Sequence, residues 1–347
     1  MTKSSIMKRW FYLLWLVAAG TGCTCGPETE KHLPGRERIV DVRENVVPIQ
    51  VRGVLLGEVI RPYLIGERLL ILDPLSEDKL IHLFDKNDFR YLGSAVPRGR
   101  GPGEIANVGR IGIDEAERVF YLSDHGKQAV FAYDPDSVLA DPFYVPKVKT
   151  AFEKGRFPGR YQYVTDTLSF ALVIEPTGNS GYRQSLARWN LVTGEMTPLK
   201  YVHPEIERKR IDFAVSPERK ICAEAYAHHD LLTLCTWDGD LICNVYGPQW
   251  TPKTSNRETH YGQVAFCGDR IFALYAGKAA SSEGRANHPT RFRVFDAAGR
   301  YLRTLETGRP VTGFCYDPEN RRIVLTLGDA DQLAYLDTAG LDKLAEE

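Results

Sequence analysis

The stretch RIGIDEAERVFYLSDHGKQAVFAYDPDS, residues 110–137, contains three short apolar runs, RIGI, VFYL and AVFAY, separated by polar turns. The runs are rich in aromatic and β-branched residues, and Asp, Gly and Pro lie at their ends. Short runs of this composition, closed by turn-forming residues, are typical of β-strands. The stretch therefore predicts three consecutive strands joined by tight turns.

The turn that closes this stretch recurs along the chain. An apolar or aromatic residue precedes Asp or Asn and a short turn follows, at Phe84-Asp85, Tyr133-Asp134, Trp189-Asn190, Trp237-Asp238, Phe295-Asp296 and Leu336-Asp337. Two strand-like runs precede each of these turn marks and one more follows most of them, at a spacing of about fifty residues. Four strands per unit at this period predict an all-β fold, a six-bladed β-propeller with four-stranded antiparallel blades.

The two ends of the repeat array indicate how the ring closes. The sixth unit stops at GLDKLAEE, residues 340–347, without a convincing outer strand, whereas RIVDVRENVVPIQV, residues 38–51, precedes the first unit. An N-terminal strand that completes the last blade would remove an open sheet edge. We therefore expect a propeller closed by an N-terminal strand, with residues 38–347 as one domain.

The N-terminal segment has the layout of an export signal. Residues 1–22 combine a basic start (Lys3, Lys8, Arg9), a short apolar run and the small residues Gly-Thr-Gly before Cys23. The apolar run is short for a membrane span, which favours a signal peptide. The alternative to lipid attachment is an ordinary cleavage site in a soluble exported protein.

A run of small residues that ends in cysteine resembles the lipobox of bacterial lipoproteins, which implies acylation of Cys23. Residues 23–37 are polar and contain proline and glycine, so they predict a flexible tether between the lipid and the propeller. The expected location is the cell envelope, with the protein lipid-anchored at the outer membrane. Whether it faces the periplasm or the cell surface stays open.

The repeat unit in residues 110–137 is similar to the repeats of NHL and TolB-type propellers. Together with GRGPGE, residues 99–104, and the lipobox-like start, it makes the chain resemble the six-bladed, TolB-like β-propeller lipoproteins that are common in Gram-negative gut anaerobes. This resemblance spans residues 38–340. It implies a fold, a location and ligand binding around the mouth of the central channel, and it implies no particular activity.

The overall charge argues against nucleic acid as the main partner. The formal net charge is −1, and the first 22 residues contribute basic side chains and no acidic ones, so the remainder is more acidic still. Nucleic-acid-binding domains are basic. The partners expected are the membrane, through the N-terminal lipid, and a protein or glycan ligand.

The stretch SAVPRGRGPGEIANVGRIGID, residues 94–114, carries arginines and a glutamate among glycines and prolines. It is not a phosphate-binding P-loop, because neither a helix nor a Gly-Lys-Ser/Thr ending follows. It joins the outer strand of the first blade to the inner strand of the second, on the face where the channel opens. Arg98, Arg100 and Glu104 are therefore candidate ligand-binding residues. The alternative is that they stabilise the corner.

Later connections from an outer to an inner strand are also basic. Arg156 and Arg160 lie in VPKVKTAFEKGRFPGR, residues 145–160, and Arg309 lies in TGRP. On one face of a slightly acidic body they would form a positive rim able to capture an anionic ligand, although ordinary solvated loop charge is the alternative. Trp250 could stack a sugar at this rim, but packing is favoured.

Two classes of function remain open. The favoured one is a non-catalytic binding or scaffold module for an anionic glycan, peptide or protein partner at the channel mouth. The other is a propeller enzyme, a lyase or hydrolase that acts on an anionic saccharide. The sequence contains no G-x-S-x-G, H-E-x-x-H or C-x-x-C motif, so it indicates no catalytic residue, metal site or cofactor.

Five cysteines follow the N-terminal segment, and their pairing stays open. They are Cys222, Cys235, Cys243, Cys267 and Cys315. Export permits disulfides, but buried free thiols are equally consistent with this spacing.

Overall fold

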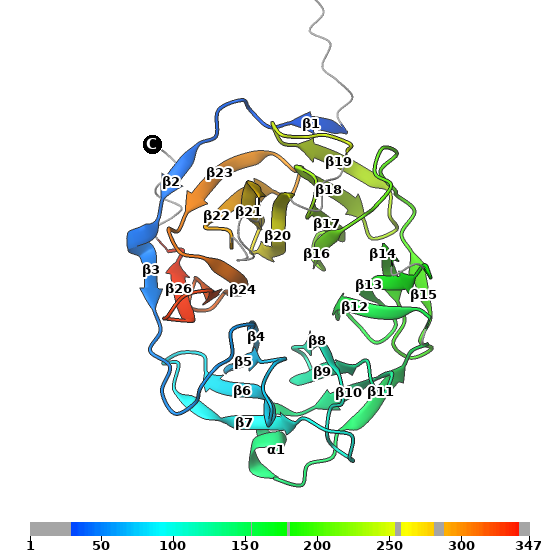
Figure 1. The fold of residues 1–347 in the computed structure, drawn as a ribbon, viewed down its shortest axis with the longest axis vertical. Coiled ribbons are helices and arrows are strands. Elements are labelled where there is room, and N and C mark those ends of the chain that lie inside the picture. The colour runs from blue at the N-terminus through cyan, green and yellow to red at the C-terminus, as the bar shows by residue number, and fades with distance from the viewer. Residues whose placement is uncertain (1–28, 154, 179–180, 254–257, 281–287, 340–347) are drawn as a thin grey trace, which may run out of the picture.

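The structure, a computed structural model, is a ring of six β-sheets around a central axis (Figure 1). It describes residues 29–153, 155–178, 181–253, 258–280 and 288–339. Each sheet has four antiparallel strands from the centre outward, and two of the sheets add a parallel strand at the outer edge. The predicted six-bladed β-propeller is therefore confirmed.

The first three blades are built from consecutive strands. Blade 1 contains β4 (Arg61–Ile65), β5 (Arg68–Leu72), β6 (Lys79–Asp85) and β7 (Tyr91–Pro97). Blade 2 contains β8 (Val108–Asp114), β9 (Val119–Asp124), β10 (Ala129–Tyr133), the short helix α1 (Pro135–Ala140) and β11 (Lys147–Ala151). Blade 3 contains β12 (Phe157–Gln162), β13 (Ser169–Pro176), β14 (Tyr182–Trp189) and β15 (Met196–Pro198).

The other three blades combine later strands with strands of the N-terminal segment. Blade 4 contains β16 (Ile211–Ser216), β17 (Ile221–Tyr226), β18 (Leu231–Thr236) and β19 (Leu241–Tyr246). Blade 5 contains β20 (Glu258–Cys267), β21 (Arg270–Ala280), β22 (Arg291–Asp296) and β23 (Tyr301–Glu306). Blade 6 contains β24 (Val311–Asp317), β25 (Arg322–Leu327), β26 (Leu333–Asp337) and, outermost, β3 (Val46–Pro48).

The N-terminal segment runs around the outside of blades 4, 5 and 6 (Figure 1). β1 (Glu30–His32) pairs in parallel with β19, and β2 (Ile39–Asp41) pairs in parallel with β23. After a 3₁₀ turn (Arg43–Asn45), β3 pairs antiparallel with β26 and completes blade 6. The predicted closure by an N-terminal strand is confirmed, and the added strands also cover two further sheet edges.

The described part of the predicted tether is not free of the propeller, which corrects the expected boundary at residue 38. Glu30 accepts hydrogen bonds from the Tyr246 hydroxyl and, at 3.2 Å, from the Asn244 amide. Glu37 forms an ion pair with Arg293, whose side chain is 0% exposed. Because these partners lie more than two hundred residues further along the chain, the composition of the segment could not reveal them.

The turn marks lie at the end of the third strand of each blade, as predicted. The side-chain oxygens of Asp85, Asn190, Asp296 and Asp337 accept hydrogen bonds of 2.8 to 3.0 Å from the backbone N–H two residues later. Asp134 instead caps the N-terminus of α1. The recurrence of Asp and Asn therefore has a local cause, since their short side chains close the turn.

Strand direction sorts the loops onto two faces of the ring. Connections from an outer strand to the next inner strand, such as residues 49–60, 98–107, 199–210 and 307–310, share one face with the loops between second and third strands. We call this the crossing face. The opposite face, which carries the turn marks, is the hairpin face. Each inner strand therefore runs from the crossing face to the hairpin face.

The hydrophobic core lies between neighbouring blades. The buried apolar side chains form six clusters, and each cluster joins strands of two adjacent blades around the ring. At the junction of blades 5 and 6, for example, Phe292 packs edge-on against Phe314 with ring centroids 5.0 Å apart. Because each blade is packed on both sides, the inner strands form a fixed wall around the centre.

The five cysteines of the propeller are free thiols. Cys315 is partly exposed and the others are buried. Cys222 and Cys235 occupy directly paired positions on β17 and β18. Burial raises the pKa of all five thiols, which keeps them in the weakly nucleophilic neutral form.

Candidate functional site

A cavity of about 1300 Å³ occupies the centre of the ring and is lined by the six inner strands, β4, β8, β12, β16, β20 and β24. At the crossing face its lining includes Glu58, His288 and Asp329, and toward the hairpin face it includes Tyr163 and Phe266. We call it the channel cavity. Ligand sites in proteins are commonly about 300–1,000 Å³, so this space is large enough for a small molecule.

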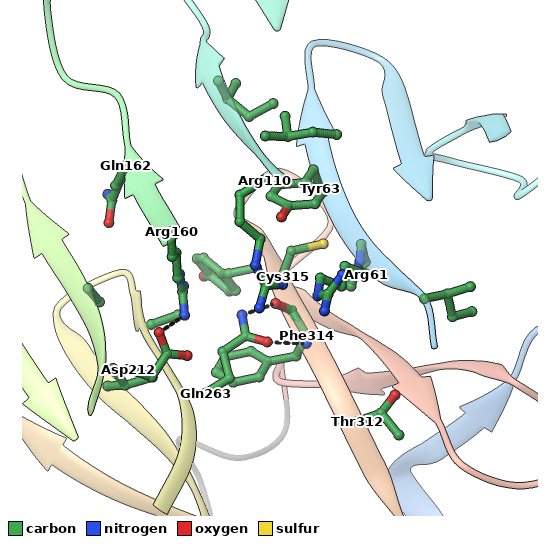
Figure 2. Close-up of a pocket in the computed structure, with 18 of the residues that line it drawn as sticks. Arg61, Tyr63, Arg110, Arg160, Gln162, Asp212, Gln263, Thr312, Phe314 and Cys315 are labelled. Atoms are coloured by element: carbon green, nitrogen blue, oxygen red, sulfur yellow. Dashed lines mark hydrogen bonds and ion pairs between the residues drawn. The ribbon is translucent and has the colours of Figure 1, made fainter. Parts of the chain in front are cut away.

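Three arginines from neighbouring blades line the channel cavity (Figure 2). Arg61 comes from β4 of blade 1, Arg110 from β8 of blade 2 and Arg160 from β12 of blade 3, and all three are partly buried. Arg160 forms an ion pair with Asp212 of β16. The side chains of Arg61 and Arg110 have no hydrogen-bond or ion-pair partner among the residues that the structure describes.

The positive charge of the channel cavity is concentrated on its inner strands, where three arginines and one carboxylate line the space. Of the carboxylates in its lining, Asp212 is paired with Arg160, Asp329 is paired with Arg309, and Glu58 is exposed at the rim. Two partly buried guanidinium groups are therefore left without a neutralising partner within the described ranges. Because burying an unpaired charge is unfavourable, an anion that enters this space would stabilise it.

The pKa values of the lining residues reflect this environment. Burial lowers the pKa of Arg61; nearby Tyr63 opposes this shift, while Arg160 adds to it. Arginine stays protonated at physiological pH, so Arg61 remains a cation that the site solvates poorly. Burial also raises the pKa of Asp212, although Arg160 opposes the change.

Kinks in four of the inner strands lie at the polar residues of the channel cavity. The pairing register shifts around Arg110 in β8, Arg160 in β12, Gln263 in β20 and Thr312 in β24. Bulges of this kind re-aim a side chain and are frequent next to functional sites. In β8 the bulge contains Gly109, where a Cβ atom would collide with Ser123 and His125, so only glycine fits.

Two glutamines join neighbouring inner strands in the wall of the cavity. Gln162 donates to the Val215 carbonyl and accepts from the Val215 N–H, both at 2.9 Å. Gln263 forms the same two bonds with Phe314 at 2.7 and 3.0 Å (Figure 2). Because these amides are already bonded, they hold the ring together and leave ligand contacts to the arginines.

Two of the arginines predicted at the channel mouth lie outside the cavity lining. Arg98 donates to the carbonyl oxygen of Ser76 at 2.7 Å and to that of Pro74, so it ties its own loop to the loop between β5 and β6. Arg100 is exposed and its side chain has no partner in the described part of the chain. The geometry of Arg98 therefore matches the corner-stabilising alternative.

Glu104 also stabilises the glycine-rich corner. Its carboxylate accepts a hydrogen bond of 2.6 Å from the Gly101 N–H, and a Cβ atom at Gly99 would collide with it. Lys127 of blade 2 then donates to the carbonyl oxygens of Gly101 and Glu104, both at 2.7 Å. Gly99 and Gly101 are thus explained by the folded-back glutamate, whereas Gly103 has a positive φ of +79° and lies against the Tyr144 backbone.

The other predicted rim residues are bonded within the protein. Arg156 lies 3.2 Å from a carboxylate oxygen of Glu175. Arg309 binds Asp329 through two hydrogen bonds of 2.8 Å and Asp331 through one of 2.6 Å. Neither arginine lines the channel cavity, although Asp329 does.

Trp250 packs against blade 4, as favoured from the sequence. Its ring centroid lies 4.8 Å from that of Tyr246, 5.2 Å from that of His203 and 5.6 Å from that of His229. This crossing is therefore held by an aromatic cluster, and Trp250 does not line the channel cavity.

Arg160 is the residue that prediction and cavity share, whereas Arg61, Arg110, Tyr63 and Asp212 were missed. A signal was present in part. The pair Gly-Arg occurs at residues 109–110 and 159–160, and Gly-Gln occurs at 262–263, each within an inner strand. Repetition of a glycine followed by a long polar side chain in equivalent strands marks the bulges of the cavity wall.

In blade 1 a serine, a histidine and an aspartate lie one after another in space, and these are the residue types of hydrolase triads. The Nδ1 atom of His82 lies 2.7 Å from the Ser94 hydroxyl, and its Nε2 atom lies 3.8 Å from the Asp73 carboxylate. That second separation is too long for a hydrogen bond. His82 and Asp73 are 4% and 2% exposed, and Ser94 does not line the channel cavity. The arrangement therefore stabilises the blade.

Among the residues that the structure describes, no three His, Cys, Asp or Glu side chains are grouped so that they could hold a metal ion. Within the same ranges, none of the helices has the length and apolar character needed to cross a bilayer.

Solved structures with the same fold come from several bacteria. A member of the DUF4221 family from Bacteroides vulgatus has a TM-score of 0.57 at 12% identity, covering 84% of this chain and 94% of its own. A candidate exported protein from Bacteroides fragilis has a TM-score of 0.52 at 11% identity, covering 86% and 87%. Hydrazine synthase from Kuenenia stuttgartiensis has a TM-score of 0.52 at 11% identity, covering 86% and 83%.

These similarities concern the fold alone, because unrelated functions share propellers at such low identity. Neither a protein-family model nor the sequence of a curated protein matches this chain.

Proposed function

We propose that this protein is a non-catalytic binding module that holds an anionic ligand in its channel cavity. The observation that carries the proposal is the convergence of Arg61, Arg110 and Arg160 on one partly buried space in which two of them lack partners among the described residues. Guanidinium groups bind carboxylates and phosphates through charge-assisted hydrogen bonds, which are among the strongest in proteins. The proposed site lies on the inner strands, deeper than the rim loops.

Binding is better supported than catalysis on an anionic saccharide. A lyase or hydrolase needs an acid and a base that can exchange protons with the substrate. In the channel cavity the Asp212 carboxylate is already paired with Arg160, and burial raises the pKa of Tyr63, so the Tyr63 hydroxyl stays protonated. Fixed positive charges are what anion binding requires.

The proposed location is the outer membrane, through a lipid on Cys23, a residue outside the described ranges. The support is the basic start, the short apolar run and the small residues that precede Cys23. Replacing Cys23 with alanine should release the protein from the membrane fraction and abolish labelling by a radioactive fatty acid.

Titration calorimetry with octanoate, succinate, inorganic phosphate and tri-galacturonate tests the binding site. The variants Arg61→Ala and Arg110→Ala should each weaken binding of the best of these anions roughly 10- to 100-fold, because hydrogen bonds to charged groups contribute about 1.5–3 kcal/mol. The melting temperature should stay the same or rise, since each variant removes a poorly solvated charge.

Arg100→Ala is the matched control, because Arg100 is an exposed arginine outside the cavity lining. It should leave affinity unchanged. Absence of binding by all four anions, or equal affinity of the two channel variants and the native protein, would overturn the proposal.

A further inference from the structure

The channel cavity differs in chemistry along its length. Near the crossing face, where the inner strands begin, it is lined by Arg61, Arg110, Arg160 and Asp212. Toward the hairpin face, where these strands end, the lining includes Ile113, Ala265, Phe266, Cys315 and Tyr316, together with Gln162, whose amide is already bonded to the Val215 backbone. Within the described chain, no charged side chain lines this second half. The cavity therefore has a cationic half and an apolar half.

The apolar half presents hydrophobic surface to the cavity. Ile113, Ala265, Phe266 and Tyr316 are partly exposed, although each also packs against one of the core clusters. Burial raises the pKa of Cys315, so its thiol is neutral and adds no charge. Hydrophobic surface inside a cavity favours an apolar occupant, because covering it removes the surface from water.

The rim of the cavity opposes additional negative charge on a ligand. Glu58 is exposed there, and in the part of the chain that the structure describes Asp329 and Asp331 share one cation, Arg309. A ligand with more than two anionic groups would exceed the two unpaired arginines and would place the others next to these carboxylates or within the apolar half. A ligand with one anionic group can place it at the arginines and avoid both.

We propose that the ligand is an amphiphilic anion, with one carboxylate or phosphate bound by Arg61 and Arg110 and an apolar body in the half of the cavity near the hairpin face. This inference rests on the proposed function and narrows it, because an acidic polysaccharide does not meet the description. The anionic group fixes the position of the ligand along the channel, and the affinity increases with the length of its apolar body.

A series of fatty acids of increasing chain length separates the contributions of the two halves to affinity, because the carboxylate stays the same while the apolar body grows. Calorimetry with butyrate, hexanoate, octanoate and decanoate should show affinity rising about fourfold per added CH₂, as expected for transfer of about 0.8 kcal/mol per methylene, until the cavity is filled. Octyl phosphate compares the two possible head groups. Succinate and tri-galacturonate should bind more weakly than octanoate.

Two variants test whether the affinity gained with chain length comes from the apolar half of the cavity and whether the affinity for the carboxylate comes from the arginines. Ile113→Thr keeps the branch at Cβ but replaces the ethyl arm with a hydroxyl group, and it should reduce the ratio of octanoate to butyrate affinity at least twofold. Arg61→Ala should weaken both acids to a similar degree and leave that ratio unchanged. The ratio is an internal control for folding, and thermal unfolding of each variant checks it independently.

The outcomes separate this inference from the proposed function. If affinity is independent of chain length, or tri-galacturonate binds best while still depending on Arg61, the amphiphile is wrong and anion binding stands. If none of these anions binds, both are overturned.

Discussion

Arg98 and Arg100 are close in sequence, yet they have different surroundings. Arg98 is bonded to two carbonyl oxygens of the loop between β5 and β6, whereas Arg100 is exposed and lacks a side-chain partner among the described residues. Their residue type is the same, so the sequence could not separate their roles. The difference arises because the loop folds back through Glu104 and carries only one arginine toward its neighbour.

We expect single substitutions to separate these two arginines. Arg98→Ala should lower the melting temperature, because it leaves the carbonyl oxygens of Pro74 and Ser76 without their donor. Arg100→Ala should leave the melting temperature unchanged, since exposed charges contribute little to stability. Thermal unfolding followed by circular dichroism measures both. Equal melting temperatures for the two variants would contradict the assignment.

A second residue-scale prediction concerns the ion pair of Asp230 and Arg293. Their side chains are 2.6 Å apart and both are 0% exposed. Asp230→Ala should lower the free energy of unfolding by about 3–5 kcal/mol, because it weakens the neutralisation of a buried cation. Urea denaturation gives the value.

Asp238 supplies the control for this measurement. It pairs with Arg188 at 2.8 Å, with 68% and 47% of the two side chains exposed. Asp238→Ala should cost less than about 1 kcal/mol, as is usual for surface ion pairs. A similar decrease in the free energy of unfolding in the two variants would show that the buried ion pair contributes no more than the exposed one.

At the scale of elements, the inner strands combine two tasks. Their regular parts carry the ladders and the interface clusters, while the bulges at Arg110, Arg160, Gln263 and Thr312 break the alternation near the crossing face. Bulges weaken pairing locally, and the packing of both neighbouring blades compensates for this. The cavity wall is therefore polar where the strands are irregular.

The histidines that pack against the connection after β19 lead us to expect that the free energy of unfolding depends on pH. Burial lowers the pKa of His203 and of His229, the two histidines that pack against Trp250, below the usual value of 6.5. The folded protein keeps both rings neutral, whereas the unfolded chain binds protons as soon as the pH falls below 6.5. This contribution to stability is present above that pH and is lost as the pH falls through the lower, folded-state pKa.

We therefore expect a smaller free energy of unfolding at pH 5.5 than at pH 7.5 in urea denaturation. A double variant, His203→Gln with His229→Gln, should lose less stability across the same interval, because glutamine does not titrate. Identical losses in the native protein and the double variant would assign the pH dependence to other groups.

At the scale of the whole molecule, the six interface clusters make the ring a single packed unit, and the N-terminal segment fastens three of its blades from outside. β1 runs parallel to β19, an outer strand that starts at the hairpin face and ends at the crossing face. The described chain therefore enters the propeller at the hairpin face of blade 4.

This topology predicts how an acylated protein would sit on a membrane. The chain between Cys23 and Glu30 can span at most about 25 Å. A lipid on Cys23 would thus hold the hairpin face of blade 4 near the bilayer, and the cationic end of the channel cavity would open away from it.

Fluorescent labels on blade 4 can measure this orientation. Asp238→Cys places a label on the hairpin face, and Gln249→Cys places one on the crossing face. With the acylated protein on vesicles that contain a head-group quencher, the label at position 238 should be quenched more strongly. Stronger quenching at position 249 would reverse the orientation, and persistence of quenching in Cys23→Ala would show attachment by another route.

The blade count, the turn marks and closure by an N-terminal strand were determined by the sequence alone. The blade count and the turn marks depend on alternation within a strand and on Asp or Asn side chains that bond the backbone two residues later, so their causes are local. Closure followed from counting strands, because the sixth unit lacked an outer strand and one strand-like run preceded the first unit. A repeated local pattern can be recognised in the sequence without the tertiary structure.

The tertiary structure decided which charged groups meet. Arg61, Arg110 and Arg160 share a cavity because adjacent blades bring their inner strands together, and strand bulges lie at the latter two. Arg98 and Arg309 have the same side chain, but neighbouring loops supply their partners. Whether an arginine is bonded or free depends on residues that are distant in sequence. A local sequence pattern does not show which distant residues will lie beside it.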